Sequence, residues 1–321
     1  MPITSDELKL YRSLYVNDAV TNGGRIGTTQ MTSGAMNNLF RNVPSSELLS
    51  GIELYRKFFI KNDNAVDIRL ENPKIWIGNI SSGEDYFTIA EGTDTDNQGV
   101  ADDYPDWYGC GILDHNINSG ETSIDVQFKQ GYGLPEGCGL IFYDGVNRAE
   151  AYMSGSPTWN GSLATITLLE GITYSYLKDE TIVSGVLELN TLQTSLTNWV
   201  ESSGEGVFDE TSFPLVLYNI GTISESWTIT FQDSTNFEVT GAVIGSLGLG
   251  SINVNFMPIN GQSYYFKLNK SGWSGTWLAG DTITFKTVHA AQGIWVKEDV
   301  PAGCNSQSNN MFELKFKGES A

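Results

Sequence analysis

The sequence predicts a mainly β protein with two to three β-sandwich or jelly-roll-like domains and an extended N-terminal arm. Three observations support this fold class. The 321 residues include 35 Gly, which favours turns over helices. Short apolar–polar alternations recur about every 8–12 residues between Gly, Asn and Pro, as in β-sandwiches. The clearest case lies between Trp273 and Trp295, where Ile283 and Phe285 alternate with polar residues after a Gly-Asp turn.

Residues 1–45 contain few strand signals and form the predicted arm. Ser5 could cap a short helix near its start. The Gly-, Thr- and Asn-rich chain that follows is typical of a segment that lies on its own domains or reaches a neighbouring subunit. Within this arm, the candidate contact residues are Leu10, Tyr11, Arg12 and Arg25.

Two β-modules are predicted next, at residues 46–112 and 113–188. Residues 189–211 are expected to be a linker with a short helix, because apolar residues recur at three- and four-residue spacings from Leu189 to Trp199. Residues 212–321 are expected to form a C-terminal β-sandwich, since eight short strand patterns follow one another there.

The charge distribution argues against several kinds of partner. The net charge is −20, and residues 71–208 alone carry −17, which disfavours binding to nucleic acid and to anionic membranes. There is no run of about 18 apolar residues and no secretory signal pattern. The three Cys lack metal-site spacing and are interpreted as thiols, which fits assembly in a reducing cytoplasm.

No catalytic motif stands out, so we do not expect an enzyme. His115 and His289 have no partner at metal-ligand spacing, and neither a GxSxG turn nor a phosphate-binding loop is present. Paired carboxylates could serve a glycoside hydrolase, but chance pairs are plentiful among 38 acidic residues.

One acidic loop is a weak calcium candidate. Asp94 and Asp96 alternate with polar residues before Gly99, and Asp102 and Asp103 could add oxygen ligands. Pro105 stands where an EF-hand would carry its bidentate Glu, so an EF-hand is rejected and a solvated loop without cofactor is the main expectation.

Aromatic residues offer a second possible site. Trp107, Trp273 and Trp277 could contact a glycan or another protein. The alternative, that these residues pack in a core, is favoured, and one of Trp273 and Trp277, which are four residues apart, is expected to point inward.

Several stretches together resemble a family of tailed-phage and prophage virion structural proteins. They are ELKLYRSLYVND and AVTNGGRIG near the N-terminus, GIELYRKFFIKN from Gly51, SGWSGTWLAGDTITFKTVHAA from Ser271, and VPAGCNSQSNN and FELKFKGES near the C-terminus. The resemblance implies a virion component assembled in the host cytoplasm as a ring or other homo-oligomer, in contact with other virion proteins. A neck, collar or tail position is expected. Head decoration and a carbohydrate-binding adhesin of the tail tip are the alternatives.

Overall fold

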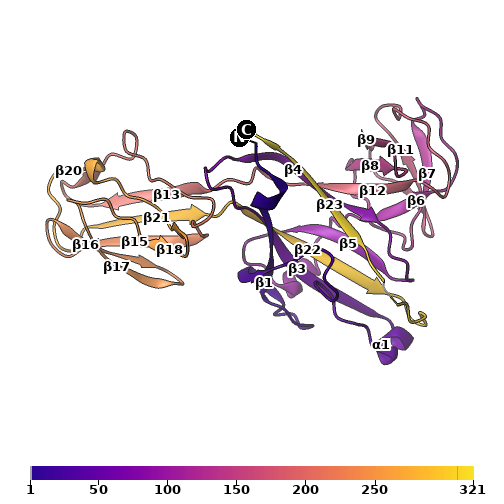
Figure 1. Cartoon of the computed structure of the whole chain (residues 1–321), viewed down its shortest axis with the longest axis horizontal. Coiled ribbons are helices and arrows are strands. Elements are labelled where there is room, and N and C mark those ends of the chain that lie inside the picture. Colours follow the sequence, from indigo (N-terminus) through magenta and orange to yellow (C-terminus); the bar gives the residue numbers. More distant parts are fainter. Residues whose placement is uncertain (1, 309) are drawn as a thin grey trace.

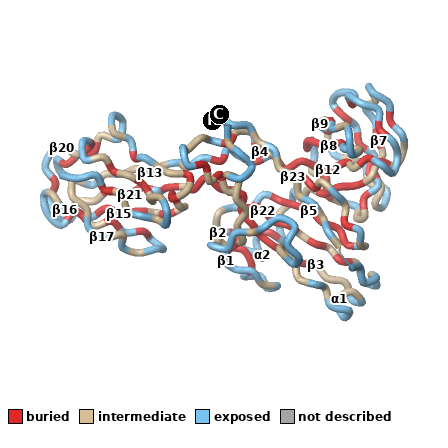
Figure 2. Tube along the Cα trace, in the orientation of Figure 1, coloured by how far each residue is buried: buried red, intermediate tan, exposed pale blue. Residues whose placement is uncertain are grey.

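Antiparallel strands dominate the computed structural model, which describes residues 2–308 and 310–321. Strands make up 47% and helices 5% of the structure, which confirms the predicted mainly β class. The sheets are gathered into three bodies along one elongated molecule (Figure 1). Buried residues run through the strands of each body, and exposed residues lie mainly on the connecting loops (Figure 2). The jelly-roll connection stays a prediction.

A five-stranded sheet forms one layer of the central body, with the order β2-β1-β3-β22-β5 and antiparallel neighbours throughout. Its strands are β1 (Leu8–Tyr15), β2 (Gly23–Gln30), β3 (Ile52–Asn62), β5 (Tyr86–Gly92) and β22 (Ala291–Val300). β3 and β22 lie far apart in the chain, yet they pair without interruption from Ile52–Val300 to Lys61–Ala291.

The other layer of the central body comes from β4 (Leu70–Asn79), β12 (Ile182–Glu188) and β23 (Glu313–Ser320). Alternate side chains of the two layers meet in one core, because successive residues of a strand point to opposite faces. This core includes Phe58, Ile60, Ile75, Ile77, Ile89, Leu187, Ile294 and Val296. The central body is therefore a β-sandwich that the C-terminal strands complete.

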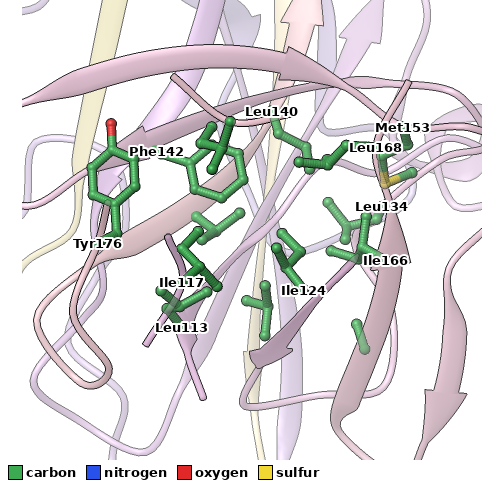
Figure 3. Close-up of a cluster of buried hydrophobic side chains, with 14 of the residues drawn as sticks. Leu113, Ile117, Ile124, Leu134, Leu140, Phe142, Met153, Ile166, Leu168 and Tyr176 are labelled. Atoms are coloured by element: carbon green, nitrogen blue, oxygen red, sulfur yellow. The ribbon is translucent and has the colours of Figure 1, made fainter. Parts of the chain in front are cut away.

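A smaller body continues from the second layer. β12 pairs with β4 at Val186–Glu188 and with β6 at Ile182–Ser184, so one strand serves two bodies. The remaining strands are β6 (Cys110–Leu113), β7 (Ser123–Gln127), β8 (Gly139–Tyr143), β9 (Arg148–Tyr152), β10 (Thr158–Asn160) and β11 (Leu163–Thr167). Figure 3 shows its core, in which Leu140 and Phe142 face Ile124 and Ile166.

The third body is inserted between β12 and β22. Its main sheet has the order β13-β21-β15-β16-β17. These strands are β13 (Ser195–Ser202), β15 (Glu225–Phe231), β16 (Asn236–Gly241), β17 (Gly245–Ser251) and β21 (Thr282–Val288). Two short pairs, β14 (Val207–Phe208) with β20 (Trp273–Ser274) and β18 (Ile259–Asn260) with β19 (Ser263–Tyr264), lie beside it. An aromatic core that includes Phe208, Trp227, Phe231, Phe237, Phe266, Trp277 and Phe285 fills this body.

Helical segments are short. They are the 3₁₀ turns η1 (Ser5–Glu7) and η2 (Lys270–Gly272) and the helices α1 (Ser45–Ser50) and α2 (Gln98–Ala101). Thr4, rather than Ser5, precedes the first turn, and its backbone N–H donates to the Glu7 carboxylate at 2.7 Å.

Three expected boundaries differ from the structure. The predicted arm contains β1 and β2, and β1 lies between β2 and β3 in the central sheet. The linker expected to hold a helix contains strand β13 instead. The expected C-terminal sandwich ends at β21, because β22 and β23 pair with β3, β5 and β4 of the central body.

Candidate functional site

The acidic loop after β5 folds back over the outer face of the five-stranded sheet, and Asp96 anchors it. One carboxylate oxygen of Asp96 lies 2.5 Å from Lys57 Nζ. The other accepts hydrogen bonds from Trp295 Nε1 and the Tyr104 hydroxyl, each at 2.5 Å. Lys57 and Trp295 are direct neighbours on β3 and β22. This ion pair is closed off from water, since Lys57 is 1% and Asp96 is 7% exposed.

The same network fixes the start of β2. Burial raises the pKa of Asp96, but hydrogen bonds from Lys57, Tyr104 and Trp295 and the charge of Lys57 outweigh burial and hold this pKa below its usual range. Lys57 Nζ also donates to the carbonyl of Gly24 at 2.8 Å. Gly23 lies so close to the Trp295 ring that a Cβ would come within 2.6 Å of it, at a φ of +104°. The position therefore requires glycine.

A second charged contact lies where the inserted body joins the central one. His289, between β21 and β22, is 5% exposed, and its Nε2 lies 2.9 Å from Asp94 Oδ1. The Asp94 oxygen lies off the ring N–H direction, so the contact is close but not an aligned hydrogen bond. Burial raises the pKa of Asp94, but His289 and a hydrogen bond from Ser224 outweigh it and lower this pKa.

Further polar contacts fasten the inserted body to the chain that leaves β3. The backbone N–H of Asn219 donates to Asp67 Oδ1 at 2.8 Å, and Lys61 Nζ donates to the carbonyl of Ile220 at 2.7 Å. Asn62 Nδ2 donates to the carbonyl of Leu192 at 3.0 Å. These contacts hold the inserted body at a defined position on the central sandwich.

The calcium candidates do not converge on one site. The carboxylate of Asp96 is used inside the loop, and Asp94 is paired with His289. Asp102 accepts from the Tyr55 hydroxyl at 2.5 Å, and Asp103 is exposed. Within residues 2–308 and 310–321, no group of three or more His, Cys, Asp or Glu is arranged to hold a metal. The structure thus assigns Asp96 to the packing of the loop.

The tryptophan candidates lie in or against cores. Trp277 is 1% exposed and stacks on Phe231 with ring centroids 4.2 Å apart. The prediction that Trp277 contacts a partner at the surface is therefore wrong. Trp273 is half-buried and packs edge-on against Phe208 at 4.7 Å. Trp107 is also half-buried, beside Tyr55. The burial of Trp277 agrees with the core packing favoured from the sequence. Trp107 and Trp277 lie outside strands and Trp273 begins the two-residue strand β20, so strand alternation alone does not place them.

The N-terminal candidates belong to the molecule's own sheet. Leu10 packs against the central core, and Tyr11 pairs with Phe59 of β3. Arg12 donates to the carbonyl of Asn38 at 2.5 Å, while Arg25 is partly exposed on β2. The expectation that these residues contact a neighbouring subunit through a free arm is therefore wrong for Leu10, whose side chain helps to close the sandwich.

Sequence reasoning missed an open face on the second layer. Two shallow hollows of about 240 and 310 Å³ lie there, lined mainly by residues of β4, β8, β9, β12 and β23. Arg148 lies over the Trp76 ring at 5.8 Å, and Lys74 lies over Tyr152 at 5.5 Å. Trp76, Ile141 and Val186 form a small cluster on this face. Tyr143 and Tyr152 remain exposed at its edge.

Glu298 is an unusual buried carboxyl in β22. It is 6% exposed, and burial together with the charge of Asp85 raises its pKa to about 8, although Arg56 opposes the shift. Asp85, itself 5% exposed, accepts hydrogen bonds from Ser81 and Asn310. Burial and the neighbouring Asp85 therefore keep the Glu298 carboxyl protonated over a wide pH range.

Replacing Glu298 by Gln is expected to stabilise the protein at alkaline pH. The folded state holds the Glu298 proton more tightly than the unfolded state, so stability is fully present below the ordinary Glu pKa and falls as pH rises through about 8. Glu298→Gln removes this loss and should raise the free energy of unfolding at pH 9 by roughly 1–4 kcal/mol. At pH 5 the variant should match the parent.

Denaturant unfolding at pH 5 and pH 9 provides the measurement. Glu136→Gln, at an exposed position, is the matched control and should show the same small effect at both values. An equal effect of Glu298→Gln at the two pH values would contradict the buried, protonated carboxyl.

The three cysteines are free thiols. Burial raises the pKa of Cys110 to about 12, so its thiol is neutral and poorly nucleophilic at ordinary pH. Cys138 is also buried, whereas Cys304 is partly exposed.

Comparison with known proteins gives no relative. No protein-family model matches the chain, and neither the curated proteins nor the solved structures contain a significant match. In the described part of the chain, no helix combines the length and the apolar character that a membrane crossing needs.

Proposed function

We propose that the chain is a non-enzymatic structural subunit of a tailed-phage particle, present in many copies in the neck, collar or tail. The observation that supports this best is the arrangement of three β bodies in one elongated molecule with open sheet edges (Figure 1). β2 ends the central sheet on one side, and β13 and β17 end the sheet of the inserted body, whereas β5, at the other end of the central sheet, is mostly buried and is bridged by Tyr108 at Ile89. Unpaired strand edges and open sheet faces can bind neighbouring chains.

A symmetric assembly suits such surfaces. Repeated copies bring many weak contacts together, so a subunit needs rigid bodies in a fixed relation more than one deep pocket. The buried Lys57–Asp96 pair and the contacts at Asp67 and Lys61 supply this rigidity. In this role the partners are further copies of the chain and other virion proteins, assembled in the host cytoplasm.

The experiment is quantitative mass spectrometry of purified particles from the phage or prophage that encodes the chain. We expect the chain at several copies per particle, and antibody labelling in electron micrographs should mark the neck or tail. Labelling over the head surface would favour the decoration alternative. Absence of the chain from intact particles would refute a virion role.

A carbohydrate-binding function at the tail tip is a second candidate, favoured by the open face with Tyr143 and Tyr152. These side chains are 37% and 40% exposed beside Arg148 and Glu150, which suits stacking on and hydrogen bonding to sugar rings. Glycan-array binding that is lost in Tyr143→Ala/Tyr152→Ala would support it. Binding that survives this double substitution would exclude the face as the glycan site.

A further inference from the structure

The inserted body has an open sheet face rich in threonine. The core side chains Trp227, Ile229 and Phe231 of β15 point to one side, so the residues between them point to the other. Strand pairing aligns these outward residues into rows across five strands. One row consists of Ser246, Thr240, Thr228, Thr284 and Val200, and the next of Leu249, Glu238, Thr230, Thr282 and Ser202.

This face is solvent-accessible and partly apolar. Thr230, Thr240 and Thr284 are exposed, and Leu249 and Val200 are 66% and 57% exposed. Thr side chains offer a methyl group and a hydroxyl, and β-branched residues lose little rotamer freedom when they are covered. Desolvating such a surface on contact with another protein therefore costs little free energy.

The face is also almost free of charge in a strongly acidic protein. The chain carries a net charge of −20, yet residues 239–266, which include β17, contain no Asp, Glu, Lys, Arg or His. The two charged residues in the rows are Glu238 and, in the adjoining row with Ser226 and Thr197, Lys286. Two copies of the chain would repel each other over much of their surface, but they would not do so here.

We propose that this threonine face binds the same face of a second copy of the chain. Thr228 lies at the centre, with Glu238 one strand and one row away on one side and Lys286 one strand and one row away on the other. A two-fold axis in the plane of the interface, at right angles to the line from Glu238 to Lys286, brings each Glu238 to Lys286 of the second copy. The contact is thus self-complementary in charge, as a two-fold interface requires.

The inference deepens the proposed function, because it names a surface through which copies associate. The sheet-on-sheet contact would bury the threonine rows between two charge pairs. The open edge of β17 would lie beside the partner sheet.

A charge-swap series with the full-length chain tests the pairing. Glu238→Lys and Lys286→Glu each place like charges opposite each other twice, so each should weaken the dimer by roughly 10- to 100-fold in Kd. The double variant Glu238→Lys/Lys286→Glu restores opposite charges and should recover most of the affinity. Sedimentation equilibrium gives Kd, and thermal unfolding checks that each variant is folded.

A second variant tests the centre of the face. Thr228→Lys should abolish dimerisation, whereas Thr158→Lys, the same change on exposed strand β10, should leave it intact. A parent protein that stays monomeric at high concentration, or a dimer indifferent to Thr228→Lys and to the single swaps, would overturn the proposal. A monomeric chain still found in many copies in particles would refute this interface and leave the virion role standing, whereas a dimer with charge-swap rescue that is absent from particles would do the reverse.

Discussion

Replacing Asp96 by Asn is expected to destabilise the protein by about 3–5 kcal/mol, because it leaves the ammonium of Lys57 buried without its direct ion-pair partner. Lys57 is 1% exposed and cannot reach water without opening the loop over the five-stranded sheet. The amide also disturbs the acceptor that Trp295 and Tyr104 share. Denaturant unfolding at pH 7, with Trp fluorescence as the signal, measures the loss.

Two further variants distinguish the loss of this ion pair from a general loss of stability caused by any change in the loop. Lys57→Met in the Asp96→Asn background removes the stranded charge and should recover part of the lost stability. Asp103→Asn, on the same loop but exposed, should change stability by less than about 0.5 kcal/mol. A double variant no more stable than Asp96→Asn alone would contradict the account.

The pH dependence follows from the lowered pKa of Asp96. Its stabilising contribution is present above the ordinary Asp pKa and is lost as pH falls through the lower folded-state value. The parent should therefore lose stability on acidification more steeply than Asp96→Asn. Equal slopes below pH 4 would speak against a buried, ionised Asp96.

Deleting residues 2–40 is expected to unfold the central sandwich while the inserted body stays folded. The deletion removes β1 and β2, exposes the edge of β3 and takes away Leu8 and Leu10 from the core. It also removes the Gly24 carbonyl that Lys57 binds. The inserted body, residues 195–288, has its own core, and its strands belong to a different sheet from β1.

Hydrogen exchange measured by mass spectrometry distinguishes the bodies. Protection should disappear from β3 and β22 and persist in β15 and β21. Leu10→Ala should cost roughly 1–3 kcal/mol, whereas Leu14→Ala on the same strand, where the side chain is 55% exposed, should cost little. Full protection of β3 after the deletion would mean that the N-terminal strands are dispensable.

The sequence predicted the β class because core-facing residues alternate in most strands. Ile283 and Phe285 of β21 both lie in the aromatic core, as their spacing indicates. The same rule places Ile124 and Val126 in the core of the small body. Local alternation is sufficient here because one face of each strand is buried.

The predicted helix at the start of the inserted body was wrong for a local reason. Strand β13 has an irregular register between Thr197 and Val200, and Asn198 adopts a φ of 56°. The extra residue brings both Leu196 and Trp199 against the core. A bulge of this kind turns a two-residue spacing into a three-residue spacing and so imitates a helix.

Long-range pairing explains the remaining differences. Nothing in the pattern around Trp295 distinguishes a strand that pairs with β21 from one that returns to β3. For the same reason, the sequence shows Asp96 as one of several loop acids and does not show that Lys57 and Trp295 enclose it. The open face with Trp76 also depends on strands that meet only in the fold.

The return of β22 to the central sheet has a consequence for folding order. During synthesis, β3 cannot pair with β22 until the whole inserted body has been made. The inserted body, in contrast, can fold as soon as β21 has been synthesised. Closing such a long loop before its contacts form slows folding. Refolding should therefore show a fast phase from the inserted body and a slower phase from the central sandwich. In the interval, β3 lacks the partner on one edge and β5 lacks its partner strand, so these two segments are the most exposed to aggregation.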